Sequence, residues 1–126
     1  MKFVFSKDYT GAGFGFLTKA RMFDKWGHFG GSAAGVLLFV ALIRLAFLLG
    51  GMPWNPVVSG ICIWIGAAMT FAIGLGYEIY QGIEEAKIKE DIGEAAWIAR
   101  GADGFSLLDL LSNVGGIALV VWIVVL

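Results

Sequence analysis

The chain has 126 residues and a formal net charge of -1, and 59% of its residues are apolar while only 15% are charged. Typical globular chains are about 45–50% apolar and about 25% charged, and a fold of this size keeps much of its surface in contact with solvent. This composition excludes an ordinary soluble domain and offers no basic stripe for nucleic acid, so we expect a single integral membrane domain over residues 1–126.

The first elements in chain order are an N-terminal segment and a first membrane span. Residues 11–23, GAGFGFLTKARMF, mix aromatic residues with Lys19 and Arg21, which is typical of a segment lying at the level of the lipid headgroups. The first span is expected over residues 29–49, which are apolar apart from Arg44. Long basic side chains near helix ends reach towards the interface, so Arg44 is expected at the outer face.

The second and third spans follow a turn that contains both prolines of the chain. No charged residue lies between Val57 and Tyr77, so a second span is expected over residues 57–78, a length that matches the bilayer core of about 30 Å. The third span is expected over residues 107–126. The fold class is therefore an all-α membrane protein with three transmembrane helices in a small bundle.

A charged stretch, residues 82–100, separates the second span from the third. Its apolar residues recur every three or four positions, a spacing that predicts a short amphipathic helix on the cytoplasmic side. Trp54 and Trp97 are interpreted as interface anchors. The residues that carry the helical spacing are Ile88, Ile92, Ala96 and Ala99.

The basic residues are distributed on one side of the predicted spans. Apart from Arg44, they precede the first span or lie between the second and the third, whereas the turn over residues 51–56 has none. Because Lys and Arg near span ends are retained in the cytoplasm, the N-terminus is expected inside and the C-terminus outside the inner (plasma) membrane. The residues are Lys2, Lys7, Lys19, Arg21, Lys25, Lys87, Lys89 and Arg100.

Three pairs of polar residues lie at the cytoplasmic end of the predicted spans. A spacing of three or four residues puts the members of each pair on one face of a helix. Ionisable groups at membrane depth are costly, so we expect these side chains to face one another in one polar cluster. The pairs are Asp24 with His28, Glu78 with Gln81, and Asp109 with Asn113.

Three roles are open for the predicted cluster. Polar side chains join membrane helices, so it is a structural lock in one interpretation. In a second, it binds a lipid headgroup or an ion; a divalent cation is the candidate cofactor. In a third, His28 is a general base held by Asp24. The candidate metal ligands are Asp24, His28, Glu78 and Asp109.

Small residues repeat at four-residue intervals on the first two predicted helices. Small residues at this spacing let helix backbones approach within van der Waals contact. We expect the partner to be another helix of this chain, with another membrane subunit or a second copy as the alternative. The residues are Gly27, Gly31 and Gly35 on the first helix, and Gly66, Thr70 and Gly74 on the second.

Three motifs, DKWGHF at 24–29, YEIYQ at 77–81 and RGADGFSLLDLLSNVGG at 100–116, resemble those of the VanZ-like family of small bacterial membrane proteins. The resemblance covers residues 24–120 apart from the charged insert at 84–94. It adds Arg100 to the candidates for the cluster. YfiM-like relatives, which share the DKxxH opening, are a second resemblance. The matching residues are Asp24, Lys25, His28, Phe29, Glu78, Gln81, Arg100, Ser106, Asp109, Asn113 and Gly116.

The resemblance implies an integral protein of the bacterial inner membrane that is linked to the cell envelope and, in some members, to resistance to the glycopeptide teicoplanin. The expected function is binding of an ion or lipid headgroup by the cytoplasmic-side cluster. The alternative is a structural or accessory subunit of a larger membrane complex, in which the cluster only locks the helices. Expected partners are the lipid bilayer and other membrane subunits or further copies of the chain, without nucleic acid.

Overall fold

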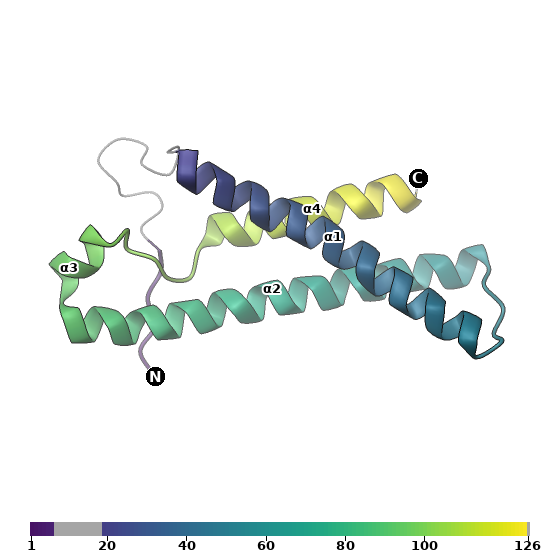
Figure 1. The fold of residues 1–126 in the computed structure, drawn as a ribbon, viewed down its shortest axis with the longest axis horizontal. Coiled ribbons are helices and arrows are strands. Elements are labelled where there is room, and N and C mark those ends of the chain that lie inside the picture. Colours follow the sequence, from purple (N-terminus) through teal and green to yellow (C-terminus); the bar gives the residue numbers. More distant parts are fainter. Residues whose placement is uncertain (7–18, 126) are drawn as a thin grey trace.

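The computed structural model describes residues 1–6 and 19–125 of the chain (Figure 1). Within these residues the chain forms the helices α1 (Lys19–Leu49), α2 (Pro56–Ile92), α3 (Glu94–Ala99) and α4 (Leu107–Val125). Helices α1, α2 and α4 are long and apolar enough to cross a membrane, which confirms the prediction of an all-α chain with three such helices. Most of the predicted interfacial segment, residues 11–23, lies outside the described residues.

A short turn reverses the chain between α1 and α2. Gly51 has a positive φ of 64°, and the Met52 N–H donates to the Phe47 carbonyl at 2.9 Å, so a backbone carbonyl of the last turn of α1 is satisfied. The Asn55 side chain accepts from the Val58 N–H at 3.0 Å, and Pro56 occupies the first turn of α2. The two long helices are therefore joined by a well-capped connection.

Helix α2 is longer than the predicted span. Its 37 residues extend about 55 Å, well beyond a bilayer core of about 30 Å. The separate amphipathic helix predicted over residues 82–100 is wrong, because residues 82–92 continue α2. These residues are mostly helix formers without a proline, so nothing ends the helix before Gly93, which has a φ of 85°.

Helix α3 folds back against the extension of α2. Trp97 is 1% exposed, its Nε1 donates to Glu85 Oε2 at 3.1 Å, and Lys89 Nζ lies 4.8 Å from its ring centroid. The interpretation of Trp97 as an interface anchor is therefore wrong, because the turn at Gly93 carries the indole onto α2. Trp54 is half-buried, and Arg44 lies 5.8 Å from its ring centroid.

The three long helices meet along a narrow apolar core. Helix α1 crosses α2 and α4 (Figure 1) and contacts both extensively, while α2 and α4 contact each other less. Val36, Ala67 and Val120, one from each long helix, are buried at the centre of this core. Many large apolar side chains on all three helices remain exposed. Lipid is a suitable solvent for such a surface, because a soluble fold would bury these side chains.

Three of the predicted packing glycines lie at helix contacts. A Cβ built on Gly35 would lie 3.0 Å from Thr70 Cγ2. Similar Cβ atoms would lie 3.2 Å from the Val36 carbonyl oxygen at Gly66, and 2.9 Å from Asn113 Nδ2 at Gly74. The predicted approach of helices within this chain is therefore observed at these glycines.

Gly27 and Gly31 do not pack, contrary to the prediction. A Cβ built on either residue meets no described atom within 4 Å. Four residues of an α-helix advance about 400°, so a four-residue repeat rotates around the helix by about 40° at each step. Gly35 therefore faces α2, whereas Gly27, two repeats earlier, lies on a part of the helix surface that does not contact α2.

The closest helix contact involves glycines outside the predicted set. A Cβ on Gly116 of α4 would collide with the Phe29 carbonyl oxygen of α1 and would lie 3.2 Å from the Ala33 nitrogen. A Cβ on neighbouring Gly115 would lie 3.3 Å from the Phe29 ring. Helices α1 and α4 therefore touch backbone to backbone.

The described N-terminal residues, 1–6, cross the extension of α2 and pair with the loop that precedes α4. Phe105 N–H donates to the Val4 carbonyl at 3.0 Å, and the Ser6 N–H donates to the Phe105 carbonyl at 2.9 Å. The Phe3 ring lies over Gly82, where a Cβ would come within 2.5 Å. This segment joins the start of the chain to the end of the bundle where α4 begins.

We predict that Gly116→Ala destabilises the bundle, because the added methyl cannot fit between α4 and the Phe29 backbone. Overpacking of this kind costs about 1–3 kcal/mol. Thermal unfolding in detergent, followed by circular dichroism, measures the loss. Gly27→Ala is the matched control, since its methyl meets open space and Ala favours a helix. Equal or higher stability of the Gly116 variant would contradict the described contact.

Candidate functional site

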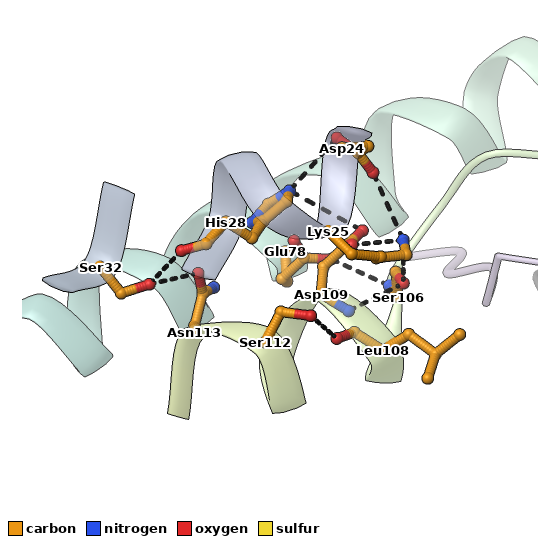
Figure 2. Close-up of polar contacts among 10 residues, drawn as sticks. All are labelled: Asp24, Lys25, His28, Ser32, Glu78, Ser106, Leu108, Asp109, Ser112 and Asn113. Atoms are coloured by element: carbon orange, nitrogen blue, oxygen red, sulfur yellow. Dashed lines mark hydrogen bonds and ion pairs between the residues drawn. The ribbon is translucent and has the colours of Figure 1, made fainter. Parts of the chain in front are cut away.

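Charged side chains from α1, α2 and α4 meet at the end of the bundle where α1 and α4 begin (Figure 2). We call this group the charged cluster. Its side chains are close enough to form ion pairs or to interact electrostatically across the three helices. The charged cluster consists of Asp24, Lys25 and His28 on α1, Glu78 on α2, and Asp109 on α4.

Lys25 is the central cation of the charged cluster. Its Nζ donates to Asp109 Oδ1 and lies 3.3 Å from Asp24 Oδ2. Its side chain is 19% exposed and that of Asp109 is 8% exposed, so the ion pair between α1 and α4 is largely shielded from solvent. Reasoning from polar pairs missed this role for Lys25, although its three-residue spacing from His28 places both side chains on one face of α1.

His28 faces one carboxylate oxygen of each aspartate. Its Nε2 lies 3.7 Å from Asp24 Oδ1 and 3.8 Å from Asp109 Oδ2. Both distances exceed those of a hydrogen bond. The two aspartates therefore each use one oxygen for Lys25 and direct the other towards the imidazole (Figure 2).

Glu78 is fully buried at the base of the charged cluster. Its Oε2 accepts from the Ser106 N–H at 2.9 Å, and no described residue forms a hydrogen bond with its Oε1. Its charge interacts with those of Asp109, His28 and Lys25. An N–H at the start of α4, together with the positive end of the helix dipole, offsets part of the cost of burying this carboxylate.

Ser106 lies immediately before α4 and contacts two of the acidic residues of the charged cluster. Its Oγ accepts from the Asp109 N–H at 3.2 Å, which is the bond of a helix N-cap, while its backbone N–H holds Glu78. The predicted cluster did not include Ser106. The signal in the sequence is a serine followed three residues later by an acid immediately before an apolar run, which is typical of a capping box.

Asn113 lies about one helical turn further into the bundle than Asp109. It is buried, and its Oδ1 accepts from Ser32 Oγ of α1 at 2.8 Å. Ser32 Oγ also contacts the carbonyl of His28. A role for Ser32 in this second polar contact between α1 and α4 was not predicted from the sequence. Its four-residue spacing from His28, which places both residues on one face of α1, is the signal that could have indicated it.

The structure does not bring Arg100 into the charged cluster. Its guanidinium donates instead to Glu85 Oε1 at 3.5 Å. The break at Gly93 turns α3 back along the extension of α2, which carries Arg100 away from the aspartates. Gln81 is half-buried and lines a cavity beside the charged cluster.

Two hollows with common lining residues border the charged cluster. A polar cavity of about 280 Å³ lies beside it, and an apolar groove of about 460 Å³ runs between α1 and α2. Asp24, His28 and Tyr77 line both. The other residues that line the groove are Gly27, Gly31, Ser32, Thr70, Ile73, Gly74 and Asn113.

We predict that Lys25→Met destabilises the bundle by about 3 kcal/mol, because it leaves a shielded carboxylate of Asp109 without its cation. Lys87→Met is the control, since Lys87 is 65% exposed and solvent screens its pair with Glu84. Thermal unfolding in detergent compares the two. The double variant Lys25→Met with Asp109→Asn should lose less than the two single losses combined. Additive losses would show that the residues do not interact.

A scan against protein-family models gives no match, and no curated protein or solved structure is found that is significantly similar to this chain. The resemblance to the VanZ-like family rests on the motif residues of the sequence. Of these, Asp24, Lys25, His28, Glu78 and Asp109 form the charged cluster.

Proposed function

We propose that this chain is a VanZ-like integral membrane protein of the bacterial inner membrane and that it binds the polar headgroup of a membrane lipid. The proposed orientation puts the N-terminus and the charged cluster at the cytoplasmic face, and the C-terminus outside. The one-sided distribution of the lysines supports this orientation. The three long apolar helices support the membrane location.

The observation that carries the proposal is that the apolar groove and the polar cavity share lining residues, Asp24, His28 and Tyr77. Ligand sites in proteins are hollows of about 300–1,000 Å³ with apolar walls and a few polar groups. Here the groove of about 460 Å³ is lined mainly by small and apolar residues and ends at His28 and Asp24, which also line the polar cavity. An acyl chain fits the first and its headgroup fits the second.

The open glycines of α1 explain why the groove exists. Gly27 and Gly31 line it, and a Cβ at either position meets no described atom within 4 Å. Larger side chains at these positions would fill the groove. The glycines therefore leave space beside the bundle instead of closing it.

The depth of the charged cluster supports a headgroup as the ligand. Asp24 begins the apolar part of α1, and Asp109 lies in the first turn of α4. Both residues therefore lie at the end of an apolar stretch long enough to span the bilayer core, which is the depth of the headgroups. Ion pairs are cheaper at this depth than at the bilayer centre.

A structural or accessory subunit is the second candidate function. The observation in its favour is that polar contacts join the helices in pairs, with Lys25 on Asp109, Glu78 on Ser106 and Ser32 on Asn113. In that role the contacts only lock the bundle, and the groove has no ligand.

We predict that Gly31→Leu removes most of the lipid that remains bound to the purified protein, because its side chain fills the groove. The bound lipid is extracted after mild detergent purification and quantified per chain by mass spectrometry. Gly30→Leu is the matched control, since Gly30 is also open and exposed but does not line the groove.

Retention of lipid by wild type and by the Gly30 variant, with loss in the Gly31 variant, is the expected result. Equal retention by both variants, or no retained lipid in wild type, would contradict headgroup binding and favour the structural role. Circular dichroism confirms that both variants keep their helix content.

A further inference from the structure

We infer that Asp24, His28 and Asp109 form a binding site for one divalent transition-metal cation of the Zn²⁺ or Mn²⁺ class, with Glu78 as the adjacent buried carboxylate. This inference goes beyond headgroup binding and stands without a lipid in the groove. Imidazole and carboxylate ligands together suit cations of this class. The potential ligand atoms of the three residues all lie within 4.8 Å of one another.

The two distances from the imidazole to the aspartates match those between ligands that share a cation. Ligands about 2.0–2.2 Å from one Zn²⁺ lie roughly 3.3–3.8 Å from each other in tetrahedral or trigonal arrangements. His28 Nε2 lies 3.7 Å from Asp24 Oδ1 and 3.8 Å from Asp109 Oδ2. These separations are too long for hydrogen bonds, so the imidazole stands off from both carboxylates.

Lys25 holds both aspartates of the proposed site. It contacts Asp24 Oδ2 and Asp109 Oδ1, which are the opposite oxygens of the two carboxylates. Outer partners of this kind fix the direction of ligating carboxylates in metal sites. Lys25 is therefore a positioning residue for the site.

Glu78 provides an observation that supports a bound cation independently of the distances between the ligand atoms. Its side chain is fully buried, and no described residue forms a hydrogen bond with its Oε1. Figure 2 shows the side chain reaching from α2 towards Asp109 and His28, and its charge interacts with both. A buried carboxylate oxygen without a partner points to a missing cation, since native proteins satisfy nearly all buried polar groups.

The balance of charge leads to the same ligand. The charged cluster holds three carboxyl groups, of Asp24, Glu78 and Asp109, and the ammonium group of Lys25, which pairs with the two aspartates. Carboxyl groups therefore outnumber ammonium groups in the charged cluster, and a bound divalent cation offsets that excess. Unbalanced charge at membrane depth is costly, so the cation stabilises the folded chain.

The site has an open side. The Asp24 side chain is 54% exposed, and all three proposed ligands line the polar cavity. Three protein ligands leave further coordination positions for water. A headgroup phosphate oxygen is the other candidate for these positions, a step that rests on the proposed function.

The test measures Zn²⁺ binding by the full-length chain in detergent after chelator treatment, with isothermal titration calorimetry and elemental analysis. Wild type is expected to bind one Zn²⁺ per chain. His28→Gln and Asp24→Asn are each expected to lower the affinity at least tenfold. Asp103→Asn, which removes a carboxylate from the same cavity outside the ligand set, is expected to leave the affinity unchanged.

The change in melting temperature on addition of Zn²⁺ is a second measure of binding, which also applies to a variant of low stability. Zn²⁺ is expected to raise the melting temperature of wild type and of the Asp103 variant, but not that of the His28 variant. No binding by wild type, or equal binding by all variants, overturns the metal site. Gly31→Leu separates the two proposals, because it should lose lipid and still bind Zn²⁺. If the wild-type chain retains lipid but does not bind Zn²⁺, the metal site is overturned and lipid binding is not.

Discussion

The fold depends on the ion pair between Lys25 of α1 and Asp109 of α4, with Glu78 of α2 held beside it by the N–H of Ser106, the residue just before α4. Apolar helices in lipid gain little from hiding apolar surface, so polar contacts and close packing decide which faces meet. These contacts tie all three long helices together at one end. Because Asp109 also belongs to the capped first turn of α4, the start of that helix and the charged cluster form together.

Glycine has two opposite uses around this cluster. At Gly116 and Gly66 it brings helix backbones into contact, which fixes the arrangement that the ion pair specifies. At Gly27 and Gly31 it leaves α1 bare, so that an apolar groove ends at His28. A cluster that only locked the helices together would need glycines for close packing and no glycines that leave a groove open. Three features together favour a ligand site: the groove, the stand-off of His28 from both aspartates, and a buried Glu78 oxygen to which no described residue donates a hydrogen bond.

The sequence predicts the three long helices and the meeting of Asp24, His28, Glu78 and Asp109, because both follow from apolar run length and helical spacing. It does not predict where α2 ends, since the change from apolar to charged residues after Tyr77 marks a change of surroundings and not of backbone conformation. Because the end of α2 was predicted wrongly, Arg100, which follows the turn at Gly93, was wrongly placed in the cluster. Contacts such as Phe3 on Gly82 join distant segments and leave no local pattern.

The central claim is that the charged cluster holds a ligand and is not only a lock. Native mass spectrometry of the wild-type chain, released directly from its own membrane without chelator or detergent exchange, tests this claim most directly. The account predicts a species carrying a divalent cation together with a lipid. Release of the bare chain alone, with its helix content and stability intact, would contradict it.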